Sequence, residues 1–285
     1  MAIPPHLLDG IKRLDPLPIT LNRLMGALRD ENVGVYQIGE IVQFDAAVVA
    51  CLLRAANSAA FGGWARTDSV RDAVGRIGKA RVIDLVLGDH VKKMATAAPM
   101  YNLTEVDLWT HATATSLAVR ALMKECPRAA LPESATVAGL LHDIGKLIMV
   151  RHLKADVSQI CALRDSKKIT FVEAEREMFG TDHAEVGGEM AKHWKFPDDI
   201  REAIARHHET PLTSSTPVLD AVVVGNMAAK AVGTGLGSEG MDVLADDRCH
   251  RRLKIGFDGF SRVCLDTLAA LKDVTAGEGR QTVNA

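Results

Sequence analysis

Apolar residues recur every three or four positions along most of the chain, which is the period of a helix that buries one face. The first such set follows the stiff segment 16–18 and consists of Leu21, Leu24, Met25 and Leu28. Residues 46–56 are apolar except for Arg54, which indicates a helix at the centre of a bundle. No stretch alternates between apolar and polar residues as a half-buried strand does. The pattern predicts an all-α protein, with the first ten residues as a loose lead-in.

The segment 94–104 interrupts this pattern and divides the chain. It contains Pro99 and Asn102 and no charged residue, which is typical of a linker. Beyond it the helical period resumes, with the glycine-rich segment 233–240 as a flexible loop. We therefore expect three parts: an N-terminal helical bundle over residues 1–100, a second helical domain over 104–275, and a flexible tail over 276–285.

Composition excludes several classes of protein. Aromatic residues make up 4% of the chain, so the core must consist of aliphatic residues and methionine, which favours helices over strands. The 34 basic and 36 acidic residues are interspersed, so we expect no nucleic-acid partner. No charge-free apolar run approaches the roughly 18 residues of a membrane span, and the chain start does not resemble a secretory signal. The five cysteines are widely separated, so a cytoplasmic, reducing location is expected.

The sharpest chemical signal is the segment Gly139-Leu-Leu-His142-Asp143-Ile-Gly145-Lys146. Neighbouring residues on a helix point about 100° apart, so His142 and Asp143 can face one ion only from a helix edge or end. Lys146 lies one turn beyond His142, on the same face. An imidazole, a carboxylate and an ammonium group suit a metal ion with an anionic ligand. Alone, however, a His-Asp pair is more often a solvated or hydrogen-bonded helix feature.

Four further histidines can join this pair. His111 lies within a helical pattern, His183 opens another, and His207 and His208 close a third. Each has a purely structural explanation: a hydrogen-bonded core residue, a helix cap, or favourable charge at a helix C-terminus. Their joint order and spacing nevertheless indicate a site.

Residues 14–275 resemble the HDOD family, the HD-related output domain proteins of bacterial signal transduction. The matching segments are 14–18, 45–62, 69–87, 108–111, 139–147 and 183–187, continuing to His207 and His208. The resemblance implies an N-terminal helical bundle packed on an HD-like helical domain. It also implies a regulatory output protein rather than an enzyme.

The wider HD superfamily consists of metal-dependent phosphohydrolases, and the resemblance implies which residues would be ligands here. The first three fall on His111, His142 and Asp143, whereas Asn226 stands where an aspartate is expected. An amide is a neutral and weaker ligand, so this change removes one anionic ligand and a candidate base. Asp220 lies almost on the opposite helix face and is a poor substitute.

The binuclear relatives, the HD-GYP cyclic-di-GMP phosphodiesterases, add histidines that match His183, His207 and His208. A lysine that contacts phosphate in those enzymes matches Lys146. Their Gly-Tyr-Pro element is absent, because the double histidine is followed here by residues 209–215, Glu-Thr-Pro-Leu-Thr-Ser-Ser. The resemblance therefore implies one or two divalent ions, for which Fe, Mn and Zn are all suitable. Asp143 and Lys146 are the catalytic candidates if the site is active.

Two main functions follow. Asn226 and the missing Gly-Tyr-Pro element favour a non-catalytic output or adaptor module that contacts other signalling proteins in trans, with a pocket kept for a metal or a nucleotide. The alternative is a metal-dependent phosphohydrolase acting on a nucleotide or cyclic dinucleotide. A third hypothesis is a purely structural scaffold, in which these histidines form hydrogen bonds with one another or with buried water. Arg54 and Asn57, one turn apart in an apolar helix, are expected in a hydrogen-bond network or at a domain interface.

Overall fold

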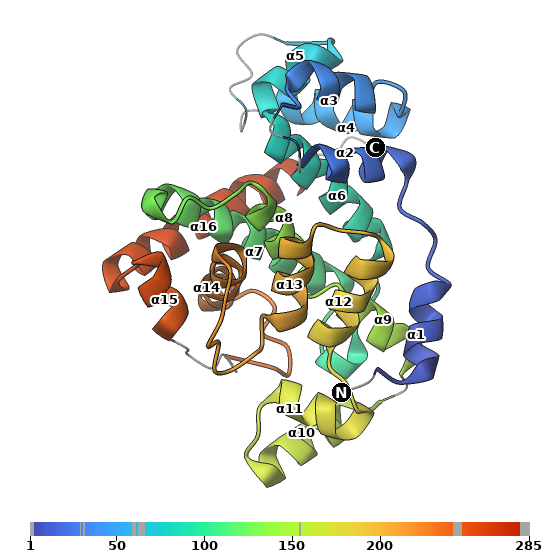
Figure 1. Cartoon of the computed structure of the whole chain (residues 1–285), viewed down its shortest axis with the longest axis vertical. Coiled ribbons are helices and arrows are strands. Elements are labelled where there is room, and N and C mark those ends of the chain that lie inside the picture. The colour runs from blue at the N-terminus through green and yellow to red at the C-terminus, as the bar shows by residue number, and fades with distance from the viewer. Residues whose placement is uncertain are drawn as a thin grey trace. The chain divides into compact units, whose positions relative to one another are not determined.

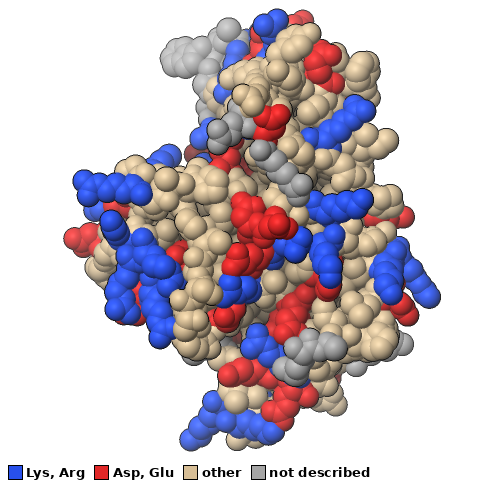
Figure 2. Space-filling view, viewed as in Figure 1, with Lys and Arg blue, Asp and Glu red and all other residues tan. Residues whose placement is uncertain are grey.

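The computed structural model describes residues 3–28, 30, 32–58, 61, 66–153, 155–241 and 247–279. These residues form helices and no strand, so the all-α prediction is confirmed (Figure 1). Within this part of the chain, no helix is long and apolar enough to cross a membrane. Basic and acidic side chains are interspersed over the face shown in Figure 2, as they are along the sequence. Contacts divide the chain into two units: residues 16–93 with 271–285, and residues 1–15 with 94–270.

The smaller unit is a bundle of short helices. Asp45 and Ser69 begin two of them by accepting hydrogen bonds from main-chain amides one turn on, which satisfies donors that a helix start leaves free. Its core is aliphatic, as the scarcity of aromatic residues predicts. The helices are α2 (Ile19–Leu28), α3 (Val35–Val42), α4 (Ala46–Ala56), α5 (Val70–Ile77) and most of α6 (Lys79–Met94).

The larger unit surrounds one core with helices from distant parts of the sequence. They are α1 (Pro5–Lys12), α7 (Glu105–Glu125), α8 (Ser134–Leu141), α9 (Gly145–His152), α10 (Val157–Lys167), α11 (Phe171–Phe179), α12 (His183–His193), α13 (Asp198–Arg206), α14 (Pro217–Ala231), α15 (Asp247–Leu253) and most of α16 (Phe257–Gly279). The long helix α7 packs against α8 and α14, while α12 packs against α9 and α13. Helix α13 also contacts α8 and α14, which closes the ring of helices around the site described below.

The first ten residues are not a loose lead-in. Helix α1 begins at Pro5 and continues to Lys12; it packs against α9 and α12 and buries Leu7 and Ile11. Gly10 approaches His152 so closely that a Cβ atom there would lie 2.5 Å from the imidazole Nε2. Two apolar residues one turn apart are too short a pattern to distinguish a helix from a loop, so only the packing shows it. For this reason residues 1–15 group with the larger unit rather than with the smaller bundle.

Two further segments differ from their predictions. Residues 94–104, expected as a linker, contain the short helix η2 (Pro99–Tyr101) and bury Tyr101 completely. The lack of charge in this segment therefore reflects burial. The tail expected from residue 276 also differs, because α16 continues to Gly279. Each residue added to an existing helix gains one hydrogen bond, so the helix can extend through residues 276–279 although two of them are glycines. Residues 280–285 of the predicted tail lie outside the described residues.

Candidate metal centre

Six side chains named by the sequence meet at one point in the larger unit. Five of them lie at helix ends or in the turn between helices, where successive residues can point toward one centre. The six are His111 within α7, His142 and Asp143 between α8 and α9, His183 at the start of α12, and His207 and His208 after α13.

Local sequence explains how the two helix starts come together. Asp182 begins α12 by accepting a hydrogen bond from the Glu185 amide at 2.8 Å, and His183 is therefore the first helical residue. The turn that carries Asp143 ends at Gly145, where a Cβ atom would lie 1.9 Å from the main-chain oxygen of His183. Only glycine allows this approach. The glycine of the His-Asp-Ile-Gly sequence thus places Asp143 beside His183.

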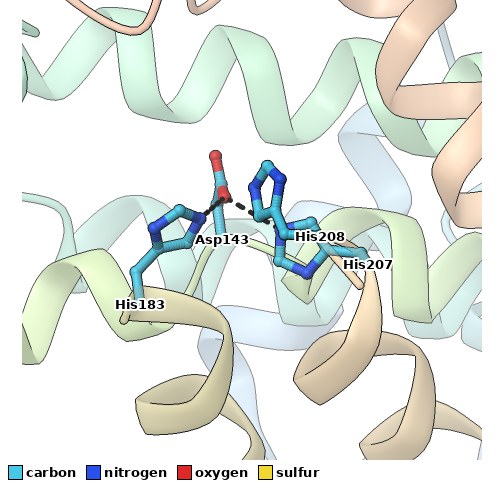
Figure 3. Close-up of side chains that lie close together, drawn as sticks. All are labelled: Asp143, His183, His207 and His208. Atoms are coloured by element: carbon cyan, nitrogen blue, oxygen red, sulfur yellow. Dashed lines mark ion pairs between the residues drawn. The ribbon is translucent and has the colours of Figure 1, made fainter. Parts of the chain in front are cut away.

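The Asp143 carboxylate lies between two sets of imidazoles. Its Oδ2 is 3.7 Å from His111 Nε2 and 3.5 Å from His142 Nε2. Its Oδ1 is 3.2 Å from His183 Nε2 and 3.6 Å from His207 Nε2 (Figure 3). Three of these four separations are too long for good hydrogen bonds. They match two groups of ligand atoms, one on each carboxylate oxygen, each compact enough to surround an ion.

The other ring nitrogen of four histidines is held by a second group. These contacts fix the orientation of each ring, as is usual for imidazoles that bind metals. They join His111 Nδ1 to Thr234 Oγ1 (3.2 Å), His142 Nδ1 to the Gly139 oxygen (2.8 Å), His183 Nδ1 to Glu175 Oε2 (2.7 Å), and His207 Nδ1 to the Ile204 oxygen (2.8 Å).

The nitrogens that face Asp143 are buried and, among the described residues, lack hydrogen-bond partners. This holds for the Nε2 atoms of all four histidines and for Asp143 Oδ1. Buried polar atoms are nearly always paired, because desolvation without a partner is costly. Orphaned atoms that converge on one carboxylate therefore fit a divalent metal ion.

Burial sets the protonation of several ligands. It lowers the pKa of His111 to about 4 and the pKa values of His142 and His208 well below the ordinary value. These rings are neutral at neutral pH, which is the form that binds metals. Burial alone would raise the pKa of Asp143, but His142 and Lys146 overcome it and hold that pKa well below its ordinary value. The carboxylate is therefore ionised.

His183 has an additional carboxylate partner that sequence reasoning missed. Burial alone would lower the pKa of His183, but the Glu175 carboxylate reverses this and raises the pKa to about 10. The other oxygen of Glu175 accepts a hydrogen bond from the Tyr101 hydroxyl at 2.6 Å. A carboxylate on Nδ1 makes an imidazole a stronger ligand, although a proton and an ion then compete for Nε2. The sequence feature that could have indicated this partner is Glu175 itself, because it is a charged residue one turn from Phe171 on the buried face of α11.

Lys146 is buried beside the centre and contacts two carboxylates. Its Nζ lies 2.8 Å from Asp143 Oδ2 and 2.7 Å from Glu239 Oε1, while Glu239 Oε2 lies 3.2 Å from Lys230 Nζ. Burial opposes both charges, but the ion pairs raise the pKa of Lys146 and lower that of Glu239 to about 2. Glu239 and Lys230 were not predicted. The loop 233–240 contributes buried groups to the centre, which its glycine content did not indicate.

Asn226 lies on α14, is 5% exposed, and has a buried Oδ1 without a hydrogen-bond partner within the described residues. Asp220 is committed elsewhere, because both of its oxygens accept hydrogen bonds from Arg252 of α15, at 2.6 and 2.7 Å. Asp220 is therefore not available as a substitute, and the fourth-ligand role of Asn226 stays a prediction from the resemblance.

Arg54 and Asn57 belong to the smaller unit and not to this centre. The Asn57 side-chain amide donates to the Thr67 main-chain oxygen and accepts from the Thr67 main-chain amide, both at 2.8 Å, which holds Thr67 beside the end of α4. The Arg54 side chain is exposed on α4.

Comparison with known proteins identifies the family and the fold. The family model of the HDOD domain matches residues 14–210. An uncharacterized protein of Treponema pallidum (strain Nichols) is 24% identical over 224 residues, which cover 78% of this chain and 43% of that protein. The chain thus spans less than half the length of that relative.

Three solved structures are similar. An HDOD domain protein of unknown function from Geobacter sulfurreducens is 24% identical, with a TM-score of 0.73 over 93% of this chain and 94% of that one. A candidate phosphohydrolase from Shewanella amazonensis SB2B is 22% identical, with a TM-score of 0.69 over 96% and 97%. A candidate signal transduction protein from Marinobacter aquaeolei VT8 is 22% identical, with a TM-score of 0.73 over 95% and 65%. The fold is shared with these proteins, and the match over more than half of the chain shows that it belongs to the HDOD family.

Proposed function

We propose that this protein is a regulatory module that binds one or two divalent metal ions and passes a signal to other proteins in trans. One observation carries the proposal: four oriented, buried imidazoles direct unpartnered Nε2 atoms at the two oxygens of Asp143. A purely structural cluster would be expected to close these gaps with direct hydrogen bonds. Three of the four separations, from 3.5 to 3.7 Å, instead leave room for ligation.

The ligands form two groups that share Asp143. The first group consists of His111, His142 and Asp143, whose Oδ2 faces the two rings. The second consists of His183, His207, His208 and Asp143, whose Oδ1 faces His183. Fe, Mn and Zn all accept such nitrogen and carboxylate ligands. A bound ion would supply positive charge and Lewis acidity at this point. The protein orients the rings through their Nδ1 contacts and excludes bulk water by burial.

Three features support a regulatory role over turnover. Asn226 is neutral where a fourth acidic ligand is expected, which weakens one half of the centre. Lys146 is already paired with two carboxylates, so an anion can reach it only by displacing one of them. The Asp143 side chain, which both groups share, is only 10% exposed. A closed centre of this kind is suited to holding an ion and reporting its presence.

The second candidate function is metal-dependent hydrolysis of a phosphate ester. It is favoured by Lys146, whose ammonium group lies beside the shared carboxylate and would bind a phosphoryl oxygen if released from its partners. One protein with this fold, from Shewanella amazonensis SB2B, is named as a candidate phosphohydrolase.

Assays on the full, metal-loaded chain distinguish the two functions. Phosphomonoesters, nucleotides and cyclic dinucleotides would be tested beside Asp143→Asn and beside His193→Ala, an exposed histidine on the same helix as His183. We expect no turnover above that of Asp143→Asn. Turnover that is lost in Asp143→Asn and kept in His193→Ala would contradict the regulatory proposal and support the hydrolase.

A further inference from the structure

The loop between α14 and α15 brings a carboxylate into the interior beside the metal centre. Glu239 is only 4% exposed, and the two lysines that it contacts, Lys146 and Lys230, are 1% and 2% exposed. Its Oε1 lies 2.7 Å from the Lys146 Nζ and its Oε2 lies 3.2 Å from the Lys230 Nζ. One carboxylate therefore spans two buried ammonium groups, with one oxygen on each.

The formal charges of this cluster balance only while Glu239 is present. Lys146 and Lys230 carry two positive charges, which Asp143 and Glu239 neutralise. Withdrawal of Glu239 alone would leave an uncompensated buried positive charge, which is strongly unfavourable. The lysine pair therefore requires an anion, and cations at the neighbouring ligands would increase that requirement.

Within segment 233–240, Thr234 contacts the centre and Glu239 follows five residues further along. Thr234 Oγ1 lies 3.2 Å from His111 Nδ1, and a Cβ atom on Gly235 would lie 2.4 Å from the His111 ring. Glu239 is followed by Gly240, whose φ of 60° is a backbone conformation that favours glycine. The Ser238 amide donates to the Tyr101 main-chain oxygen, and the Gly240 amide donates to the Leu236 main-chain oxygen. The backbone is thus held on both sides of Glu239, so its displacement requires rotation of the Glu239 side chain.

We propose that Lys146 and Lys230 form an anion-binding site that Glu239 occupies from within the chain, and that inorganic phosphate or a phosphate ester binds by displacing the Glu239 carboxylate. Phosphate presents several anionic oxygens, so it can form ion pairs with both ammonium groups as the two carboxylate oxygens do. Glu239 thus keeps the centre closed until phosphate competes for the lysines. This inference rests on the proposed function, because phosphate would be the ligand that the regulatory module senses.

Titration calorimetry with inorganic phosphate on the full chain, metal-loaded and metal-free, tests this site. Glu239→Gln keeps the size of the side chain and removes its charge, so we expect phosphate affinity to rise at least roughly tenfold in both forms, a factor worth about 1.4 kcal/mol. The matched control is Glu189→Gln, which alters a surface pair with Lys192. Its phosphate affinity should equal that of the wild type.

A second variant covers the case in which Glu239→Gln leaves too much buried charge to fold. Lys230→Gln combined with Glu239→Gln removes one charge of each sign and retains the Lys146 contact with Asp143. This double variant should bind phosphate more tightly than the wild type but less tightly than Glu239→Gln.

Equal phosphate affinity in the wild type and in folded Glu239→Gln would overturn the proposal. So would an affinity gain that is unchanged when Lys230 is also replaced. If only the double variant folds, an affinity no higher than that of the wild type decides against the site. Metal content, measured on the same samples, tests the proposed function separately, because the metal-free titration reports on the lysine pair alone.

Discussion

At the scale of single residues, one buried carboxylate, that of Asp143, lies between two sets of imidazoles. Asp143 has little exposure and yet makes few close contacts with the histidine nitrogens around it. Its separations from the rings are explained if each oxygen is a ligand, because two ligand atoms of one ion stand further apart than a hydrogen-bonded pair. The groups that contact the Nδ1 atoms of the rings would then determine how tightly an ion is held.

Glu175→Gln should weaken metal binding at the His183 group by roughly 10- to 100-fold, as is typical when the partner of a ligating imidazole is lost. Glu175 contacts His183 Nδ1 at 2.7 Å, and its charge makes that ring a better ligand. Metal titration measures the change. Glu177→Gln, on the same helix but exposed, should bind as the wild type does; equal affinities in all three proteins would refute the role of Glu175.

Asn226→Asp should raise the metal affinity of the His111 and His142 group by about tenfold, because a carboxylate replaces a neutral amide ligand. Asn226 is buried with an unpartnered oxygen, so the substitution changes charge with little change in shape. Asn226→Ala should lower affinity. If Asn226→Asp binds metal no better than Asn226→Ala, Asn226 is not at the fourth-ligand position.

The sequence predicted which six side chains come together, but not the groups that contact them. His111, His142, Asp143, His183 and the double histidine carry chemistry in their identity and order. Glu175 could have been recognised, because a carboxylate on the apolar face of a helix needs a partner. Glu239 could not, because nothing in a glycine-rich loop indicates which helices it will fold against.

At the scale of helices, the centre depends on how closely α9 and α12 start beside each other. Gly145→Ala should destabilise the larger unit by roughly 1–3 kcal/mol and reduce metal binding, because its Cβ would lie 1.9 Å from the His183 oxygen. Gly256→Ala, where a Cβ meets nothing within 4 Å, is the matched control. Denaturant unfolding of both variants measures the difference, and similar stabilities would argue against the close approach.

The start of α7 gives a pH-dependent prediction. Asp107 and Thr104 form a capping box, and hydrogen bonds from Thr104 lower the pKa of Asp107. Because the folded pKa lies below the unfolded one, the carboxylate stabilises the fold above the unfolded pKa, and this is lost as pH falls through the folded pKa. Asp107 is exposed, so water screens its charge. Asp107→Ala should therefore cost only roughly 0.3–1 kcal/mol at pH 7 and progressively less below about pH 4.

Unfolding curves at pH 7 and below about pH 4 measure the cost of Asp107→Ala at each pH. The control is Asp266→Ala, which replaces an exposed aspartate on α16. A cost for Asp107→Ala that does not depend on pH would mean that the cap acts without its charge.

Helix periodicity predicted the architecture well where apolar patterns were long, and failed where they were short. The apolar patterns of the smaller bundle and of α14 extend over several turns. In helix α1 the buried residues with apolar side chains are Leu7 and Ile11, one turn apart. The buried segment around Tyr101 resembled a linker because residues 94–104 carry neither charge nor a helical period. Tertiary contacts, which periodicity does not describe, fixed both segments.

At the scale of the whole molecule, metal binding and folding should be linked. A divalent ion at 100 times its Kd would stabilise the native chain by about 2.7 kcal/mol, provided that it does not bind the unfolded chain. Thermal unfolding should therefore shift upward with added ion and return after chelation. Asp143→Asn should not respond, whereas His193→Ala should respond as the wild type does. A wild-type Tm unchanged by ions at saturating concentration would contradict the linkage.

Elemental analysis of the purified full chain after incubation with Mn²⁺, Fe²⁺ or Zn²⁺ and dialysis tests the central claim most directly. We predict one or two bound ions per wild-type chain, the same content in His193→Ala, and loss of the ions in Asp143→Asn, since both ligand groups share that carboxylate. A folded wild-type chain that retains no ion, or an Asp143→Asn chain that retains the full content, would contradict the account.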